Sequence, residues 1–135
     1  MRYFLGVDVG SSKTHALLVN ERGQCVGFGK SGGGNYQGVG YNGLAAVLQE
    51  SCEAALVAAG VDKAQVAGAG FGVAGYDFPS DRPAHLEVIS RLGLKCPVEI
   101  VNDGVNGLLA GATNGIGVNV TVREWIISSA EQFSV

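Results

Sequence analysis

One stretch near the start of the chain carries residue types that could bind phosphate. It reads Gly6-Val7-Asp8-Val9-Gly10-Ser11-Ser12-Lys13-Thr14 and lies between two apolar runs, Tyr3–Val9 and residues 15–19. Short apolar runs joined by glycine, serine and lysine predict two strands and a tight hairpin turn. Such a turn directs backbone N–H groups, hydroxyl groups and an ammonium group at one point. These are the donors that a polyphosphate needs, so we interpret the hairpin as a site for the phosphates of ATP.

The neighbouring residues add to this interpretation and limit it. Asp8, at the entry to the turn, could hold a hydrated Mg²⁺, since this ion prefers carboxylate oxygen and keeps most of its waters. A Walker A loop is excluded, because it needs glycine directly before Lys-Ser/Thr and a following helix. Here Ser12 precedes Lys13, and residues 15–19 favour a strand. An ordinary polar turn stays open from this stretch alone, because glycine and serine are common turn residues.

A second acidic residue follows a later apolar run. Asn102-Asp103-Gly104 comes directly after residues 98–101, and Gly75-Tyr76-Asp77 follows another predicted strand. In an open α/β sheet, ligands bind outside the carboxyl ends of the strands. Asp103 would also begin a helix, whose N-terminus favours the ionised carboxylate that a proton acceptor needs. By itself this aspartate is more simply a helix cap. Beside the phosphate hairpin, we interpret it as a general base.

Composition limits the classes of partner. The chain has 135 residues, of which 47% are hydrophobic, 16% are charged and 22 are glycines. This favours one compact α/β domain with many tight turns. The net charge of −3 offers no basic surface, so we expect no nucleic-acid or membrane partner. No apolar run approaches the roughly twenty residues of a membrane span. Asp8 comes too early for a signal peptide, so we expect a cytoplasmic location.

The cysteines and histidines suggest no metal centre. Cys25, Cys52 and Cys96 are odd in number, far apart and without CxxC spacing. This is typical of reduced, mostly buried thiols. The two histidines, His15 on a predicted strand and His85 on a predicted helix, are expected to be structural or solvated.

The periodicity predicts an alternation of strands and helices. Asn42 and Gly60 mark the ends of the first helix, and Ser80 and Gly93 those of the second. The order indicates a mixed five-stranded sheet, with three strands in an antiparallel meander and flanking helices. The predicted strands are Tyr3–Val9, 14–20, 24–30, Val66–Val73 and 98–101, and the predicted helices are 44–59, 80–92 and 105–112.

Two glycine-rich segments need separate interpretation. In the predicted loop 31–36, Gly32-Gly33-Gly34 indicates backbone that passes close to another segment, and a flexible linker is the alternative. Residues 70–75 match GxGxxG in letters, but the glycines fall within a predicted strand and a loop follows. A dinucleotide site needs that run to open a helix, so we interpret the match as chance.

These segments carry a resemblance to a known family. The sequence resembles the N-terminal lobe of the BadF/BadG/BcrA/BcrD-type ATPases and N-acetylglucosamine kinases, in the sugar kinase–Hsp70–actin superfamily. Residues 6–14 resemble its first phosphate hairpin, 72–75 its sugar-side loop and 101–104 its connecting and catalytic motif. Gly34-Asn35 resembles the loop in which an asparagine contacts the hexosamine. The resemblance covers about residues 3 to 117 and implies a ribonuclease H-like, actin-like ATPase lobe.

The resemblance also implies roles for single residues. Asp8 would bind Mg²⁺ or its waters. Asn35 and the backbone near Gly75 would position the sugar, and Asp103 would contact the sugar and take the proton from its 6-hydroxyl group. The implied function is phosphoryl transfer from ATP to N-acetylglucosamine or a related hexosamine. The implied contacts to the β- and γ-phosphates come from Gly10, Ser11, Ser12, Lys13 and Thr14.

The last part of the chain departs from the family pattern. Residues 115–120 start like the first strand of a second lobe, but 121–125 replace the expected Gly-Thr-Gly-Ser-type turn. We therefore expect an N-terminal lobe at 1–117, a divergent or truncated tail at 118–135, and no second lobe. Such a chain should lack appreciable kinase activity by itself. Trp125, Ile126 and Ile127 could cap the lobe or associate with another copy, so a homodimer is possible.

Two other functions stay open. One is an ATPase that activates a radical dehydratase or reductase through a bridging iron–sulfur cluster, which the three cysteines do not decide. The other is a sugar-binding module without enzyme activity. Iron and sulfide analysis of a full-length parent would detect the first, and sugar titration with and without ATP and Mg²⁺ would detect the second.

Overall fold

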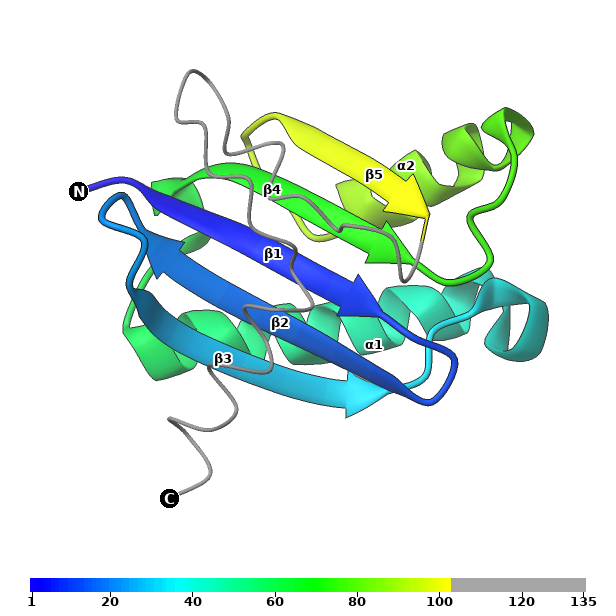
Figure 1. Cartoon of the computed structure of the whole chain (residues 1–135), viewed down its shortest axis with the longest axis horizontal. Helices are drawn as coiled ribbons and strands as arrows, with labels where there is room; N and C mark the ends of the chain where they lie inside the picture. The colour runs from blue at the N-terminus through cyan, green and yellow to red at the C-terminus, as the bar shows by residue number, and fades with distance from the viewer. Residues whose placement is uncertain (103–135) are drawn as a thin grey trace.

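The computed structural model describes residues 1–102, which form a five-stranded mixed sheet with helices packed against it (Figure 1). The strand order is β3-β2-β1-β4-β5. Strands β1, β2 and β3 pair in antiparallel fashion, whereas β4 pairs parallel with both β1 and β5. This confirms the predicted mixed sheet with its meander. The strands are β1 (Tyr3–Val9), β2 (Lys13–Asn20), β3 (Cys25–Gly32), β4 (Val66–Val73) and β5 (Val98–Asn102).

The predicted strand positions agree closely with these bounds. β1 and β4 match residue for residue, and β2 and β5 differ by one residue at one end. β3 continues to Gly32, so it includes two residues that were predicted as loop. The GxGxxG-like letters begin inside β4, which confirms that they do not open a helix.

Helix α1 (Tyr36–Ala59) begins eight residues earlier than predicted, so the expected start at Leu44 is wrong. The side chain of Asn35 caps it by accepting a hydrogen bond from the N–H of Gln37 at 3.0 Å. Gly40, at φ 75° and ψ 172°, breaks the helix near its start. Glycine is a poor helix former, so this glycine-rich first part carries no helical pattern in the sequence. The predicted stop at Gly60 is confirmed by its left-handed φ of 67°.

Helix α2 (Arg82–Ser90) follows a single 3₁₀ turn, η2 (Pro79–Asp81). The prediction that Ser80 caps this helix is wrong, because Ser80 lies inside η2 and is exposed. Asp81 stands directly before the helix instead. The helix ends at Ser90, and the chain then reaches Gly93 with a positive φ of 75°. A second 3₁₀ turn, η1 (Lys63–Gln65), precedes β4.

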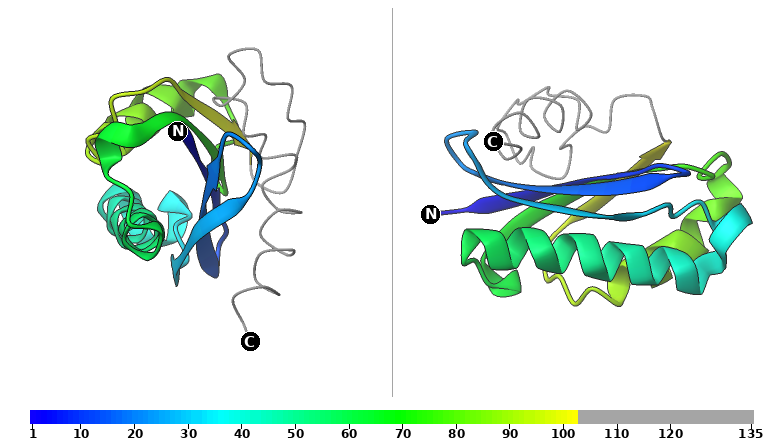
Figure 2. Two further views of the ribbon diagram at one scale, coloured as in Figure 1. Left: turned by 90° about the vertical axis from the view of Figure 1, so that its left-hand side faces the viewer. Right: turned by 90° about the horizontal axis from the view of Figure 1, so that it is seen from below.

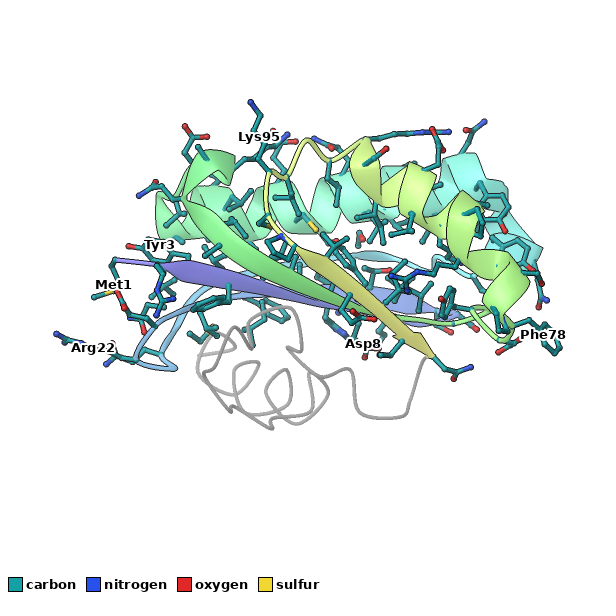
Figure 3. The ribbon with its side chains drawn as sticks, turned by 90° about the horizontal axis from the view of Figure 1, so that it is seen from above. Met1, Tyr3, Asp8, Arg22, Phe78 and Lys95 are labelled. Carbon is teal, nitrogen blue, oxygen red and sulfur yellow. The ribbon has the colours of Figure 1, made fainter. Side chains whose placement is uncertain are left out.

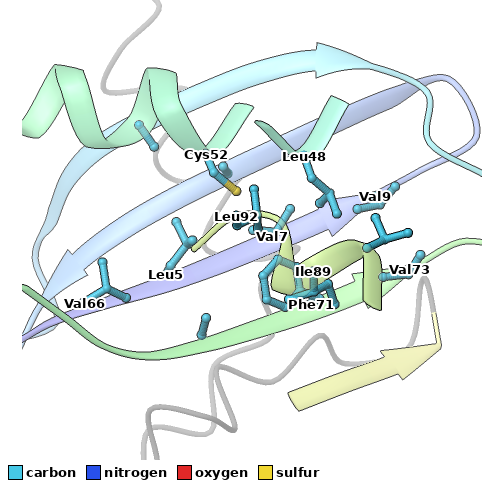
Figure 4. Close-up of a cluster of buried hydrophobic side chains, with 14 of the residues drawn as sticks. Leu5, Val7, Val9, Leu48, Cys52, Val66, Phe71, Val73, Ile89 and Leu92 are labelled. Carbon is cyan, nitrogen blue, oxygen red and sulfur yellow. The ribbon is translucent and has the colours of Figure 1, made fainter. Parts of the chain in front are cut away.

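Both helices cover the same face of the sheet (Figure 2). Apolar side chains from alternate strand positions point to this face and pack beneath the helices (Figure 4). Leu5, Val7 and Val9 of β1 are fully buried in this core, with Phe71 of β4. Asp8 lies between two of them in sequence and therefore faces the opposite side of the sheet (Figure 3). That side carries a smaller buried cluster of Phe4, Leu17 and Val19.

Several expectations fall on residues outside the described part of the chain. They are the general base Asp103, the helix at 105–112, the tail at 118–135 and the apolar group Trp125, Ile126 and Ile127. Within residues 1–102, no helix is both long and apolar enough to cross a membrane.

Candidate functional site

Three strands end side by side at one edge of the sheet. Val9 is in register with Val73, and Val73 with Asn102, so β1, β4 and β5 finish at the same level. The N–H of Ala74 donates to the carbonyl oxygen of Val9 at 2.8 Å, which extends this pairing past the end of β4. Loops at the carboxyl ends of parallel strands form the ligand sites of open α/β sheets. The hairpin after β1 and the loop after β4 therefore adjoin, as predicted, and Asp103 follows Asn102 directly in sequence.

The phosphate hairpin presents its polar side chains outward. Ser11, Ser12 and Lys13 are exposed, whereas Gly10 is half-buried. The N–H of Gly10 donates to the carbonyl oxygen of Lys13 at 2.8 Å and closes the turn. Two hydroxyl groups and one ammonium group therefore remain at the surface of the hairpin. This is a donor set suited to an anion.

Thr14 occupies a different environment from these residues. Its side chain is fully buried, and its hydroxyl group donates to the carbonyl oxygen of Gly32 at 2.8 Å. This bond fixes the hairpin to β3. A direct contact between Thr14 and a phosphate would require the bond to be given up, so Thr14 acts structurally in this arrangement.

The segment after β3 passes directly against the hairpin. A Cβ atom on Gly33 would collide with the carbonyl oxygen of Ser11. The N–H of Gly34 donates to the carbonyl oxygen of Gly10 at 3.0 Å. The predicted close approach is thus confirmed for Gly33 and Gly34. It does not hold for Gly32, where an added Cβ atom would meet no other atom within 4 Å.

Because Gly33 and Gly34 pass close to the hairpin, the next residue, Asn35, lies against the loop after β4. A Cβ atom on Gly75 would lie 2.5 Å from Oδ1 of Asn35, so only glycine fits there, and its φ of 88° also favours glycine. The structure therefore brings together the two described residues predicted on the sugar side. Gly33 and Gly34 link them to the phosphate hairpin.

Further polar residues, which the sequence analysis did not single out for these contacts, fix the loop after β4. Nδ2 of Asn102 donates to Oδ1 of Asp77 at 2.9 Å and to the carbonyl oxygen of Tyr76 at 3.0 Å. From the other side, Oδ2 of Asp81 accepts hydrogen bonds from the N–H groups of Phe78 (2.9 Å) and Asp77 (3.0 Å). The bond from Phe78, followed by that from Asp77, lowers the pKa of Asp81. In the sequence, the feature that could have indicated this turn is Asp81, four residues after Asp77, because aspartate side chains often accept hydrogen bonds from nearby backbone N–H groups.

Asp8 and His15 are paired neighbours on the sheet face opposite the helices. Asp8 is half-buried, and its partner on β4 is Gly72, which has no side chain. His15 is also half-buried and stacks on Phe28 at a ring distance of 5.7 Å. Burial lowers the pKa of His15, and the ammonium groups of Lys30 and Lys13 lower it further. His15 is therefore a neutral, packed side chain at neutral pH.

The three cysteines are thiols that form no disulfide with one another, but the expectation that they are mostly buried is wrong, because Cys25 and Cys96 are only half-buried. Cys52 is buried in the core, and burial raises the pKa of its thiol to about 12. No group of three or more His, Cys, Asp or Glu side chains within residues 1–102 is placed to hold a metal ion.

A comparison with known families decides the relationship that these features suggest. The sequence model of the BadF/BadG/BcrA/BcrD ATPase family matches residues 5–122. The chain belongs to this family. The match includes the phosphate hairpin, Asn35, Gly75 and Asp103, and it ends a few residues beyond the expected boundary at 117. No curated protein sequence matches the chain.

Two solved structures align with this BadF/BadG/BcrA/BcrD family member. A proposed N-acetylglucosamine kinase from Chromobacterium violaceum aligns with a TM-score of 0.59 and 22% identity, over 76% of this chain and 35% of that chain. Component A of (R)-2-hydroxyglutaryl-CoA dehydratase from Acidaminococcus fermentans aligns with a TM-score of 0.45 and 19% identity, over 73% and 31% of the two chains. The chain thus spans about a third of each protein. The first likeness confirms the actin-like lobe.

Proposed function

We propose that this chain is the N-terminal lobe of a kinase that transfers the γ-phosphoryl group of ATP to N-acetylglucosamine or a related hexosamine. One observation carries the proposal. The outward-facing phosphate hairpin and the contact between Asn35 and Gly75 lie at one edge of the sheet, joined by Gly33 and Gly34. Phosphoryl transfer depends mainly on positioning a donor and an acceptor next to each other, and this juxtaposition supports that task.

In this proposal, the hairpin binds the phosphates of ATP. Ser11, Ser12 and Lys13 supply the exposed donors, and Gly10 and Thr14 shape the turn through their bonds to Lys13 and Gly32. The ammonium group of Lys13 neutralises charge on the transferring group, as an electrostatic clamp does in phosphoryl transfer. The protein's own contribution is a preformed turn, since these groups are already gathered at its surface.

Asp8 fits the place of a magnesium ligand. It is the next-to-last residue of β1, close to the start of the hairpin, and its neighbour on β4 is a glycine. Mg²⁺ is usually held by one or two carboxylates and by substrate phosphates, and it keeps several waters. One carboxylate next to a phosphate site fits this donor set. The bound ion would neutralise charge on the phosphates.

The acceptor side combines Asn35, Gly75 and Asp103. Asn35 and the backbone of Gly75 orient the sugar, and Asp103 takes the proton from the attacking hydroxyl group. As that oxygen forms its bond to the γ-phosphorus, the bond to the bridging oxygen of ADP breaks and the proton goes to Asp103. Asp103 follows Asn102 directly, and the hydrogen bond from Asn102 to Asp77 fixes the backbone before it.

We further propose that residues 1–117 form this lobe and that the chain alone turns over little. It covers only 35% of the aligned kinase, and catalysis needs contacts from both sides of the donor. The proposal is therefore best tested by binding. Robust phosphorylation of N-acetylglucosamine by the purified 135-residue chain would contradict this part of it.

The test is a titration of the 135-residue chain with ATP and Mg²⁺, followed by NMR, in wild type and Lys13→Met. We expect wild-type shifts at residues 10–14 and roughly tenfold weaker binding in the variant, for the loss of one charge-assisted contact. Lys95→Met is the matched control, because Lys95 is exposed and precedes β5 at the opposite edge of the sheet. Equal binding by all three proteins would refute the hairpin assignment.

A parallel titration with N-acetylglucosamine separates a kinase from a simple sugar-binding module. For a kinase lobe, we expect shifts at Asn35 and Gly75 that increase when ATP and Mg²⁺ are present. Shifts with sugar that ignore ATP would favour the module instead.

A further inference from the structure

His85 is the most unusual buried residue in the described part of the chain. It lies on α2 with no exposed surface, although no step of the proposed reaction uses it. Its Nδ1 atom is 2.7 Å from the carbonyl oxygen of Asp81. A carbonyl oxygen can only accept, so Nδ1 carries the proton. Nε2 is buried and has no hydrogen-bond partner among residues 1–102.

Three tyrosine rings surround this imidazole. Tyr36 and Tyr41 each meet it nearly at right angles with ring centres 5.4 Å apart, and Tyr76 does so at 5.1 Å. Tyr36 and Tyr41 also stack on each other at 4.6 Å, although the break at Gly40 separates them along α1. The imidazole is the common contact of all three rings.

The contacts of His85 with Tyr36, Tyr76 and Asp81 lead to the acceptor side of the proposed site. Tyr36 directly follows Asn35, and Tyr76 directly follows Gly75. The carbonyl oxygen of Asp81 accepts the hydrogen bond from Nδ1 of His85. The carboxylate of Asp81 accepts hydrogen bonds from the N–H groups of Asp77 and Phe78. The hydroxyl group of Tyr36 donates to the same carboxylate at 3.4 Å. His85 is thus linked to both segments that meet at the contact between Asn35 and Gly75.

Packing alone does not account for a histidine here. A buried polar atom without a partner destabilises the folded state, and a phenylalanine would keep the ring contacts without that cost. The feature of histidine that phenylalanine lacks is the N–H bond to Asp81. The loss of stability from the unpaired Nε2 therefore accompanies the placement of an N–H donor inside an aromatic cluster.

We propose that His85 is a positioning residue for the acceptor site: through the hydrogen bond from its Nδ1 to Asp81 and through its ring contacts, it fixes Asp81 and the three tyrosines and so holds Asn35 against Gly75. The identity of the ligand in this statement rests on the function proposed above. The positioning itself is a property of the fold and can be tested without any ligand.

The test compares His85→Asn and His85→Phe in the full 135-residue chain. Asparagine keeps an N–H donor near the place of Nδ1, whereas phenylalanine keeps the ring and loses the donor. We expect amide hydrogen exchange at Asp77 and Phe78 to be about tenfold faster in His85→Phe and within about threefold of wild type in His85→Asn. The amides of Val7 and Val73, in the core strands, serve as internal controls and should stay protected in both variants.

Two results of the exchange experiment would overturn the proposal. One is wild-type protection at Asp77 and Phe78 in His85→Phe, which would make the imidazole a space filler. The other is an equal loss of protection in His85→Asn, which would remove the role of the donor. If either variant fails to fold, the tautomer of His85 in the wild-type protein provides the test. Long-range nitrogen–proton NMR should find the proton on Nδ1, and a proton on Nε2 would refute the proposal.

A ligand arm separates this inference from the proposed function. N-acetylglucosamine should shift Asn35 and Gly75 in wild type and His85→Asn, with about tenfold weaker binding in His85→Phe. If wild type gives no response to the sugar, the proposed function fails while the exchange data still decide the role of His85. Equal sugar binding by His85→Phe and wild type would overturn the positioning role in the acceptor site.

Discussion

Asn102, the last described residue of β5, donates a hydrogen bond of 2.9 Å from Nδ2 to Oδ1 of Asp77. Twenty-five residues separate the two along the chain, yet they lie at the same edge of the sheet. The bond joins the end of β5 to the loop after β4. It also precedes Asp103, so it couples the position of the proposed base to the acceptor-side loop.

Removing this bond should loosen the loop at modest cost to the fold. Asn102→Ala removes both hydrogen bonds of Nδ2, and we expect it to lower the free energy of unfolding by about 1 kcal/mol, because both bonds are exposed and each contributes at the low end of the usual range. Urea denaturation measures this change. Gln49→Ala is a suitable control, because its exposed 3.3 Å bond to Glu53 joins two neighbouring turns of one helix and connects no separate segments, so its loss should change stability very little. Equal effects of the two substitutions would contradict the tie between β5 and the loop.

Thr14 should matter for stability through its hydroxyl group. In Thr14→Val the carbonyl oxygen of Gly32 loses a donor in a partly buried hydrogen bond, so we expect a loss of about 1 kcal/mol in the free energy of unfolding. Thr14→Ser keeps the donor and should be affected less. If valine were as stable as threonine, the bond would not fix the hairpin to β3.

Gly75 allows a separation of backbone strain from steric collision. Gly75→Ala meets both a positive φ of 88° and Oδ1 of Asn35, whereas Gly60→Ala meets a positive φ of 67° in open space. We expect a loss of about 1–2 kcal/mol from strain at Gly60 and a larger loss at Gly75. Adding Asn35→Ala should recover part of the second loss, and the double-mutant cycle measures the coupling. Full additivity would mean that the two residues do not interact.

Acid should release the loop after β4 through Asp81. Its hydrogen bonds to Phe78 and Asp77 lower its pKa from the ordinary 3.8, so the folded state holds the ionised carboxylate more tightly than the unfolded state. The stabilisation is present above the unfolded pKa and is lost as pH falls through the lower folded value. Urea midpoints measured from about pH 5 to about pH 2 should therefore fall less steeply in Asp81→Asn than in wild type. Identical slopes would refute this linkage.

Much of the fold follows from local pattern, and part of it does not. The strand Tyr3–Val9 and the strand Val66–Val73 are apolar runs bounded by turn residues, so their limits could be read directly. The start of α1 could not be predicted in this way. Gly38, Gly40 and Gly43 interrupt the spacing of apolar residues that indicates a helix, and the helix begins instead after the capping residue Asn35. Ser80 was a reasonable cap by residue type, but the bonds from Asp77 and Phe78 place Asp81 before the helix.

The candidate site divides in the same way. Lys13, Asn35 and Gly75 could be proposed from turn chemistry and family resemblance. The roles of Asn102, Asp81 and His85 depend on side-chain contacts between segments that are far apart in sequence. Neither periodicity nor composition carries that information, because it arises only when the strands end at a common edge.

The single glycine break in α1 has a consequence for how this family could diversify. Residues 36–39 change direction at Gly40, whereas the long part of the helix keeps its buried side chains, from Leu44 to Leu56, on the sheet. Substitutions in the short turn can therefore re-aim Asn35 while the core retains its packing. Under the proposed function, the short segment adjoins the acceptor site and the long segment carries the core contacts, so selection can alter acceptor preference with little loss of core packing.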